Sequence, residues 1–441
     1  MKPVRTLILG AGLAGLSAAF HLPRKETMLI EREAEVGGLC RSRDVDGFVF
    51  DCTGHLLHLR EGPVRDMVLG LLPEAFHAVR RRALIFSKGV LTGYPFQANT
   101  HGLPLEVVRE CVVGFVESLT RAGASGEPEN FRQWVLATFG EGIARHFMFP
   151  YNEKLYRVDL TEMECGWVSW SIPRPTLDEV IRGALGTEVR GLGYNAQFLY
   201  PKKGGISCIP KALAARCGSI LLGCAVRSID PVARRVTFDS GESVGYERLI
   251  STLPLDSLIR MLQPLPEGIP RHGAEGLRAV KVVNVNLGVA RPDVLPGHWI
   301  YFPEPEYPFY RVGSPTNYSR SVAPPGCSSL YVEVARRRDE AADPRRIEEE
   351  VLDGLRRARI LRRTDRVVAR EVLVLDPAYV IYDHFRRAAL PGILEALERH
   401  AILSTGRFGA WEYGSMESAM RQGREAAERG APLRRAAGDR R

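Results

Sequence analysis

The chain has 441 residues, more than a single hydrophobic core usually supports, so we expect two or more structural units. Its hydrophobic fraction of 45% and charged fraction of 25% are ordinary for a globular protein, and no run of about 18 apolar residues suggests a membrane span. The N-terminal sequence has no signal-peptide pattern, and we expect a cytoplasmic protein.

The positive charge is unevenly distributed along the chain. Half of the net charge of +8 comes from residues 429–441, where five Arg accompany one Asp, and this stretch is expected to be a flexible basic tail. The sequence displays no basic face of the kind that nucleic acids require, so we expect no nucleic-acid partner. An anionic small-molecule substrate would account for part of the remaining excess.

The eight cysteines form neither a C-x-x-C pair nor a spacing typical of zinc sites. We therefore expect reduced, mostly buried thiols, with no disulfide and no metal.

The N-terminal segment reads as strand, tight turn, helix and strand. Gly10, Gly12 and Gly15 stand in a G-x-G-x-x-G arrangement that follows the first strand and opens the helix, where a backbone can approach a pyrophosphate. Glu31 ends the second strand, where a carboxylate can accept the hydroxyls of a ribose. The pattern predicts a dinucleotide-binding βαβ unit; the alternative is an unrelated glycine turn with Glu31 as a surface charge.

Two further segments indicate the cofactor. The stretch Glu31-Arg-Glu-Ala-Glu-Val-Gly-Gly-Leu-Cys-Arg-Ser resembles the second signature of flavin amine-oxidase-type proteins, and Thr405-Gly-Arg-Phe-Gly-Ala-Trp-Glu-Tyr resembles the segment that brings a helix N-terminus to the flavin ring in that superfamily. The resemblance implies FAD as the cofactor, and the helix dipole would stabilise negative charge on the reduced flavin.

The later elements complete an α/β fold class. Helix-like apolar spacing at 104–122, 129–147 and 176–186 predicts a mostly helical insertion over 100–190. Alternating strands are expected at 219–252 and 279–335, an amphipathic helix at 345–361, and a strand, loop and helix from 401 to 428. We expect a Rossmann-like FAD-binding domain from 1–75, 195–275 and 370–428, with the helical domain inserted. An antiparallel β-sheet substrate domain would be formed by 276–369 with 76–99.

Several internal segments resemble UDP-galactopyranose mutases, particularly the eukaryotic type, in the same order along nearly the whole chain. They are Phe50-Asp-Cys-Thr-Gly-His, Tyr94-Pro-Phe-Gln, Pro150-Tyr-Asn-Glu-Lys-Leu-Tyr, Asn195-Ala-Gln-Phe, Tyr200-Pro-Lys-Lys-Gly-Gly, Tyr301-Phe-Pro-Glu, Pro308-Phe-Tyr-Arg and Asn317-Tyr-Ser.

This resemblance implies a set of site residues. The catalytic group would be His55, Arg311 and Asn195. The cofactor would be held by Gly10, Gly12, Leu13, Ala14, Gly15, Glu31, Arg32, Gly37, Gly38, Leu39, Arg41, His55, Gly204, Gly205, Arg407, Tyr413 and Met416. The uridine end of the substrate would contact Tyr94, Phe96, Gln97, Asn152 and Tyr156, and the diphosphate and sugar would contact Asn195, Tyr301, Arg311, Tyr379 and Tyr413.

These residue types suit the ligand. A guanidinium fork and phenolic hydroxyls donate hydrogen bonds to a diphosphate, and an aromatic face with an amide suits a uracil ring. Taken singly, Phe96 and Tyr156 read as core aromatics, Asn152 as a cap or turn residue, and His55 as a structural histidine.

The implied activity is that of an isomerase, an intramolecular transferase. Such an enzyme contracts the ring of a UDP-hexopyranose to the furanose form, with no net redox change, through a covalent adduct of sugar and reduced FAD; NAD(P)H is a candidate reductant. Two alternatives stay open: an FAD-dependent oxidase or dehydrogenase of the amine oxidase or protoporphyrinogen oxidase type, and a flavin-bound protein that binds a nucleotide without turnover.

The chain departs from the family pattern on the substrate side. Ser171 stands where the family has an arginine on the diphosphate, and a serine cannot replace a bidentate cation. Arg174 could reach the same space if its segment were helical, which Pro173 disfavours. Thr53 replaces a glycine beside His55, and Tyr156 replaces a tryptophan. These changes suggest a related nucleotide sugar or altered chemistry on the same scaffold.

Overall fold

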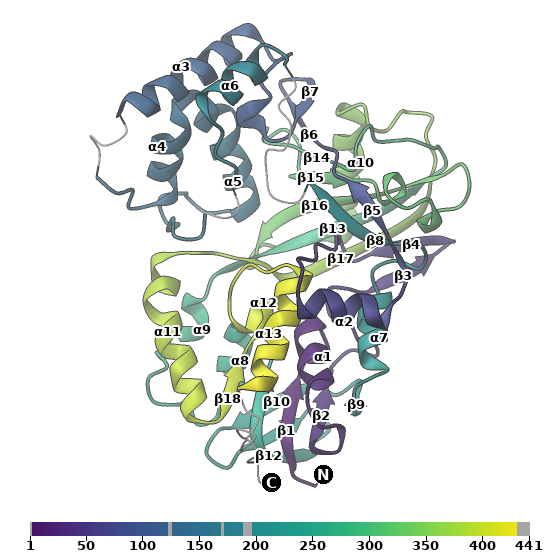
Figure 1. Ribbon diagram of the computed structural model, residues 1–441, viewed down its shortest axis with the longest axis vertical. Coiled ribbons are helices and arrows are strands. Elements are labelled where there is room, and N and C mark those ends of the chain that lie inside the picture. The colour runs from purple at the N-terminus through teal and green to yellow at the C-terminus, as the bar shows by residue number, and fades with distance from the viewer. Residues whose placement is uncertain (1, 122–125, 169–171, 188–195, 430–441) are drawn as a thin grey trace, which may run out of the picture.

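The computed structural model describes residues 2–121, 126–168, 172–187 and 196–429. Over these residues the chain forms two large sheets, a body of helices and several covering helices (Figure 1). This mixed α/β architecture confirms the expected fold class. Ser171 and Asn195, singled out from the sequence, lie outside the described residues.

The first sheet contains the N-terminal βαβ unit. Its strands run in the order β10 (Val226–Asp230), β11 (Arg235–Phe238), β12 (Ser243–Ser251), β1 (Val4–Leu9), β2 (Thr27–Ile30) and β9 (Ser219–Leu221), with β18 (Ile402–Ser404) paired to β12. The strands β12, β1, β2 and β9 are parallel, and β10 to β12 form an antiparallel meander. Leu7, Ile8 and Leu9 of β1 are fully buried, as expected for a central parallel strand.

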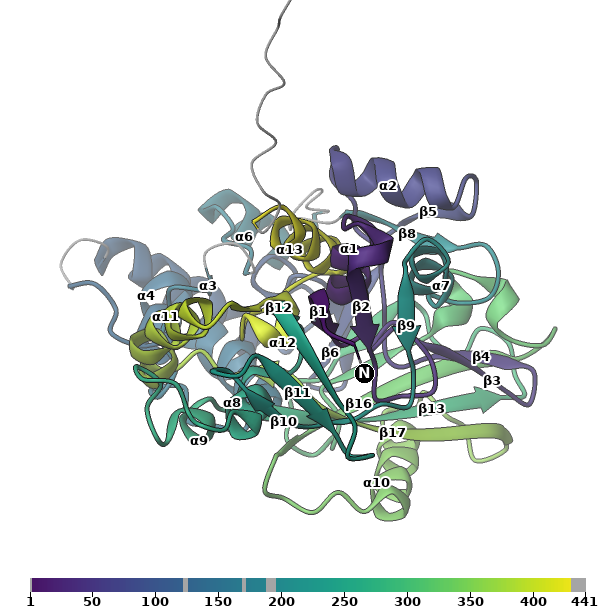
Figure 2. The same cartoon turned by 90° about the horizontal axis from the view of Figure 1, so that it is seen from below.

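Helices cover this sheet. α1 (Leu13–Phe20) and α13 (Met416–Glu428) lie side by side, as Figures 1 and 2 both show, although they come from opposite ends of the chain. Their close approach depends on Gly423, because a Cβ at that position would lie 2.1 Å from the carbonyl oxygen of Ala14. The other helices of this part are α2 (Pro63–Leu71), α7 (Cys208–Ala214), α8 (Leu255–Met261), α9 (Gly273–Gly276), α11 (His384–Arg399) and α12 (Gly406–Gly409).

The second sheet is predominantly antiparallel. Its order is β17 (Val367–Val380), β13 (Ala279–Val289), β16 (Ser328–Arg337), β15 (Arg311–Gly313), β14 (Trp299–Tyr301), β6 (Ala83–Ser87) and β7 (Val90–Gly93). α10 (Pro344–Arg357) packs its apolar face against this sheet. The domain boundary expected at residue 370 falls inside β17, which pairs with β13 along most of its length.

The helical body consists of α3 (Leu105–Arg121), α4 (Phe131–Ile143), a π-helical turn (Ala144–Met148), α5 (Phe149–Tyr156) and α6 (Leu177–Ala184). Two short hairpins complete the fold. β3 (Ser42–Val45) pairs with β4 (Phe48–Asp51), and β5 (Phe76–Arg80) pairs with β8 (Gln197–Pro201). The β5–β8 pair holds together the two ends of the excursion that includes the helical body.

Candidate functional site

The glycine turn between β1 and α1 is closely packed on one side and open on the other. A Cβ at Gly15 would lie 1.9 Å from the carbonyl oxygen of Gly10, and Gly10 itself has a φ of 97°. A Cβ at Gly12, in contrast, would meet no atom within 4 Å. The turn therefore leaves space directly at the N-terminus of α1, where free backbone N–H groups attract anions.

The carboxylate of Glu31 is fixed beside this turn. One oxygen accepts a hydrogen bond from the N–H of Ala11 at 2.7 Å and the other accepts from the N–H of Glu33 at 3.0 Å. The side chain is 8% exposed. Each oxygen keeps a lone pair, so the carboxylate can still accept from a ligand hydroxyl.

The paired glycines lie against the same turn. The N–H of Gly37 donates to the carbonyl of Ala11 at 2.8 Å, and a Cβ at Gly38 would come within 3.2 Å of Gly12 Cα. Arg41 is held by the loop itself, because its Nε donates to the Gly38 carbonyl at 2.8 Å and its Nη1 to Glu33 at 3.2 Å. Of the other residues expected here, Leu39 is half-buried and Arg32 is exposed beside Glu33.

A buried aspartate organises the next part of the site. Asp51, 4% exposed, accepts hydrogen bonds from the Ser42 hydroxyl at 2.6 Å, the Tyr200 hydroxyl at 2.7 Å and the Ile206 N–H at 3.1 Å. These bonds fix the Gly204–Gly205 turn against the β3–β4 hairpin. Burial raises the pKa of Asp51 to about 6 in spite of the three donors.

Arg311 lies on β15 opposite Glu333 on β16. Its Nε and Nη2 donate to the two carboxylate oxygens at 2.5 and 2.6 Å, which is the bidentate geometry of a strong ion pair. Glu333 is 2% exposed, whereas Arg311 is half-buried. The other N–H groups of the guanidinium remain for an anion.

His55 lies close to this pair. Its Nδ1 donates to the carbonyl oxygen of Thr53 at 3.2 Å, which leaves Nε2 as an acceptor in the neutral ring. Burial lowers the pKa of His55 to about 4. The hydrogen bond to Thr53 and the negative charge of Glu333 oppose this shift, and the charges of Arg407 and Arg311 add to it. His55 is therefore neutral near pH 7.

Buried and half-buried tyrosines from distant segments meet here. The rings of Tyr94 and Tyr301 lie 5.4 Å apart, and those of Tyr379 and Tyr413 lie 6.0 Å apart. Tyr156 contacts Tyr413 at 6.3 Å. Tyr151 and Tyr310 connect the first pair to the second through ring contacts. Five of the tyrosines are members of the expected substrate set, namely Tyr94, Tyr156, Tyr301, Tyr379 and Tyr413.

Arg407 belongs to the same neighbourhood. Its Nη1 donates to the carbonyl of Gly414 at 3.0 Å and its Nη2 to that of Ala378 at 2.9 Å. The guanidinium carbon lies 5.3 Å from the ring centre of Tyr379 and 5.9 Å from that of Tyr413. This arrangement sets the approach to α13, where Met416 is the first residue of the helix and the Ser415 side chain caps it.

Most of the residues expected to contact uridine make contacts with other residues of the protein. Phe96 is fully buried and stacks on Phe147 at 4.9 Å. Gln97 donates to the Pro173 carbonyl at 2.5 Å. Asn152 lies inside α5, so it is neither a cap nor a turn residue, and it donates to the Met148 carbonyl at 2.7 Å. The roles of these residues, like those of the other site residues, stay predictions.

The arginine considered as a replacement at the diphosphate lies in a non-helical segment beside the helical body. Arg174 is exposed and its guanidinium sits 5.1 Å from the ring centre of Trp134, on the helical body. Its segment begins α6 only at Leu177, so the helical condition for Arg174 is not met.

Comparison with known proteins identifies the family. The family model described as flavin containing amine oxidoreductase matches residues 13–429. The chain belongs to this family. Its structure is similar to that of reduced UDP-galactopyranose mutase, with a TM-score of 0.90 and 30% identity over 96% of this chain and 93% of that one. The sequence-based resemblance to the mutases is thereby confirmed.

Two weaker likenesses accompany this match. A protein provisionally described as a protoporphyrinogen oxidase from Exiguobacterium sp. 255-15 has the same fold, with a TM-score of 0.74 and 16% identity over 97% of this chain and 98% of that one. An uncharacterized protein from the nifH2 3′ region of Methanothermococcus thermolithotrophicus is 33% identical over 64 residues; this match spans 14% of the present chain and 62% of the relative's length.

The residues of this flavin amine oxidoreductase fit its flavin cofactor. The open space at Gly12, the N-terminus of α1 and the fixed carboxylate of Glu31 suit the pyrophosphate and ribose of a dinucleotide. Gly204 is similarly open, since a Cβ there would meet no atom within 4 Å.

Three residues of this region, Asp51, Lys154 and Glu333, were given no role from the sequence, although Asp51 and Lys154 stand in the segments quoted for the resemblance. Lys154 of α5 donates to the carbonyls of Phe302, Glu304 and Phe309 and so ties the helical body to the second sheet. Burial lowers its pKa to about 8. The available signal was a charged residue within an apolar or aromatic run, as in Phe-Asp-Cys and Tyr-Val-Glu-Val.

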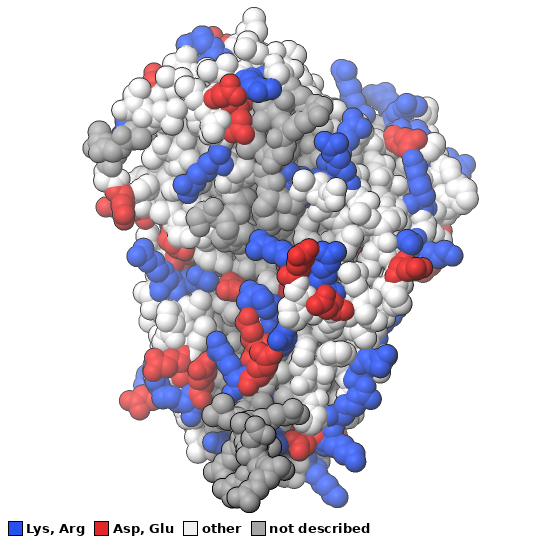
Figure 3. Space-filling view, viewed as in Figure 1, with Lys and Arg blue, Asp and Glu red and all other residues white. Residues whose placement is uncertain are grey.

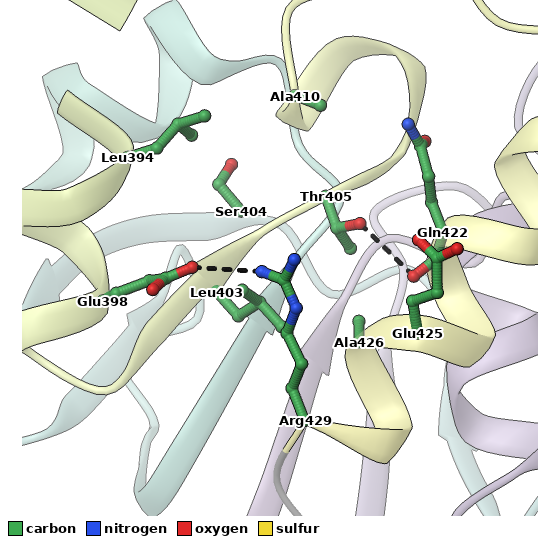
Figure 4. Close-up of a pocket in the computed structure, with 10 residues that line it drawn as sticks. All are labelled: Leu394, Glu398, Leu403, Ser404, Thr405, Ala410, Gln422, Glu425, Ala426 and Arg429. Carbon is green, nitrogen blue, oxygen red and sulfur yellow. Dashed lines mark hydrogen bonds and ion pairs between the residues drawn. The ribbon is translucent and has the colours of Figure 1, made fainter. Parts of the chain in front are cut away.

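A separate cavity of about 190 Å³ lies between α11, β18 and α13 (Figure 4). Arg429 closes one side by pairing with Glu398 at 3.3 Å. The predicted site residues do not contribute to its lining, which consists of Leu394, Glu398, Leu403, Ser404, Thr405, Ala410, Gln422, Glu425, Ala426 and Arg429.

Charge on the described surface is not uniform. Lys and Arg predominate along the right-hand edge of Figure 3, from the region of α10 down to β2 and β9, whereas both signs mix over α11. The positive excess is therefore present on the folded body as well as in the tail sequence. Among the described residues, no helix is both long and apolar enough to cross a bilayer, and no group of three His, Cys, Asp or Glu could hold a metal ion. All eight cysteines are free thiols.

Proposed function

We propose that this chain is a flavin-dependent nucleotide-sugar mutase that converts a UDP-hexopyranose to the furanose without net redox change. The observation that carries the proposal is the convergence of the segments that resemble the mutases. Tyr94, Tyr301, Arg311, Tyr379 and Tyr413 are separated by up to 319 positions in the sequence, yet a series of ring contacts connects the four tyrosines. Arg311 lies directly opposite Tyr301 in the β14–β15 pair. The structural likeness to UDP-galactopyranose mutase supports the same conclusion.

The protein's own groups suit the departure and return of a diphosphate. Arg311 offers its remaining N–H groups to the phosphate oxygens, and the tyrosine hydroxyls add hydrogen bonds without adding charge. Burial raises the pKa of Tyr301, so this phenol stays protonated and able to donate, whereas the Tyr413 hydroxyl donates to the carbonyl oxygen of Val380 at 3.1 Å. When bound, reduced FAD supplies the nucleophile for the anomeric carbon. The neutral His55 offers an acceptor nitrogen at Nε2.

The proposal is tested by anaerobic turnover. The flavin-bound protein is reduced with dithionite and mixed with UDP-galactopyranose or UDP-galactofuranose. Interconversion of the two sugars with the flavin still reduced is the expected result. A protein that binds neither sugar nucleotide, and whose oxidised flavin is instead bleached by an amine or a porphyrinogen, would be an oxidase or dehydrogenase. Binding of UDP without interconversion would favour a non-catalytic nucleotide-binding flavoprotein.

A further inference from the structure

Thr53 lies between His55 and the Glu333–Arg311 ion pair and is hydrogen-bonded to both His55 and Glu333. It follows β4 and precedes His55 by two positions. The resemblance to the mutases implies a glycine at this position. The neighbouring backbone is confined, because a Cβ at Gly54 would lie 2.4 Å from the Tyr331 hydroxyl. As a β-branched residue, Thr53 has few accessible side-chain rotamers.

The hydroxyl and the carbonyl of Thr53 point to different partners. The hydroxyl donates to Oε1 of Glu333, the same oxygen that accepts from Arg311 Nη2. The carbonyl oxygen accepts from His55 Nδ1 at 3.2 Å. Thr53 thus contacts both the carboxylate of Glu333, which orients Arg311, and the imidazole ring of His55.

A third donor on Glu333 has a clear physical effect. A carboxylate buried to 2% exposure requires its lone pairs to be occupied, and a hydroxyl donor helps to hold its plane in one orientation. Because the fork of Arg311 is bidentate, a rotation of the carboxylate would carry the guanidinium with it. Glycine at position 53 supplies neither the hydroxyl nor the rotamer restraint.

We propose that Thr53 is a positioning residue whose hydroxyl orients the Glu333–Arg311 pair toward the anionic diphosphate of the substrate. The inference rests on the proposed function for the identity of that anion. It assigns to Thr53 a gain in substrate affinity that a glycine at this position would lack. The Thr53 hydroxyl should not change the binding of FAD, because the glycine turn and Glu31 are on other segments.

The test uses the flavin-bound full-length protein with three substitutions. Thr53→Val keeps the shape and removes the hydroxyl, Thr53→Ser keeps the hydroxyl, and Thr53→Gly restores the residue of the mutases. UDP affinity is measured by isothermal titration calorimetry and FAD content by absorbance. We expect Val and Gly to weaken UDP binding about ten-fold, as the loss of a hydrogen bond to a charged group predicts. Ser should remain within about two-fold of the wild type, with FAD content equal in all four proteins.

UDP binding by Thr53→Val as tight as by the wild type, or equal weakening in Thr53→Ser, would overturn the positioning role. Failure of the wild type itself to bind UDP would overturn the proposed function instead.

The contact of Thr53 with Glu333 would then be tested by the pH titration of His55, followed through the flavin spectrum. The groups that face His55 are Glu333, Arg311 and Arg407. Without the hydroxyl the charge of Glu333 is less compensated, so Thr53→Val should titrate at higher pH than Thr53→Ser. Coincident titrations would overturn the proposal.

Discussion

Arg311 and Glu333 make up the most constrained charge pair near the tyrosines, and each depends on the other. Replacing Arg311 by alanine should weaken UDP binding by roughly 2–5 kcal/mol, because a buried charge pair with the diphosphate is lost. It should also destabilise the protein by roughly 3–5 kcal/mol, since Glu333 is left buried without a cation. Calorimetry with UDP and urea unfolding measure the two effects separately.

The matched control is the double variant Arg311→Ala/Glu333→Gln. It should recover part of the lost stability, because the buried charge is gone, while UDP binding stays weak. Restored affinity in the double variant, or unchanged affinity in the single one, would remove Arg311 from the substrate site.

Two buried groups of one segment should give opposite pH dependences of stability. The pKa of His55 falls to about 4 on folding, so between pH 4 and 6.5 the unfolded chain binds a proton that the folded protein does not. The neutral His55 therefore contributes to the free energy of unfolding at neutral pH, and this contribution is lost as the pH falls from 6.5 toward 4. The pKa of Asp51 rises to about 6, so its contribution is present at low pH and is lost as the pH rises from 3.8 to 6. Each contribution is at most about 3 kcal/mol, and in the wild type they largely offset each other.

His55→Gln should therefore leave a protein that becomes more stable, relative to the wild type, as the pH is lowered from 6.5 to 4.5. Asp51→Asn should show the reverse trend. Urea unfolding at several pH values measures both, and identical pH profiles for the two variants would contradict the assignment.

At this scale the sequence places the residues of one local motif relative to each other better than it places partners from distant segments. Gly10, Gly12, Gly15 and Glu31 belong to one local motif, so their relation follows from spacing alone. Glu333 could not be paired with Arg311 in this way, because the pairing depends on the β15–β16 register. The ring contacts among tyrosines likewise arise from the packing of separate chain segments.

The turn before α1 shows how one motif contains two kinds of glycine. Gly15→Ala should disturb folding, because its Cβ would lie 1.9 Å from the Gly10 carbonyl. Gly12→Ala should fold as the wild type but bind FAD less tightly, since its Cβ enters the space available to the pyrophosphate. Urea unfolding of the apoproteins and FAD titration distinguish the two. Equal FAD affinity for Gly12→Ala and the wild type would place the pyrophosphate elsewhere.

Most of the regular elements followed from periodicity. The helices expected at 104–122, at 176–186 and at the end of the 401–428 segment correspond to α3, α6 and α13. α11 was not foreseen, because Pro391 lies inside it and paired arginines interrupt the apolar pattern near its start. The single helix expected at 129–147 is instead α4, which is kinked at Gly140 with a φ of 73°, followed by a π-helical turn.

For the molecule as a whole, the cofactor site connects the two ends of the chain. The predicted FAD contacts extend from Gly10 to Met416, and α1 and α13 pack directly against each other. A ligand that binds only the folded state stabilises it by about 4 kcal/mol at a thousand times its Kd. The melting temperature should thus rise with FAD concentration, as measured by circular dichroism. A melting temperature independent of added FAD would show that FAD does not bind preferentially to the folded chain.

The position of β1 has a consequence for synthesis on the ribosome. β1 is among the first segments to be made, but its two neighbours in the sheet are β2 and β12, and β12 ends at Ser251. At about 5–20 residues per second, β12 follows β1 after on the order of ten seconds or more. During that interval one edge of β1 lacks its partner strand, and exposed apolar edges of this kind favour aggregation. The nascent chain is therefore expected to need shielding by a chaperone until the meander has been translated.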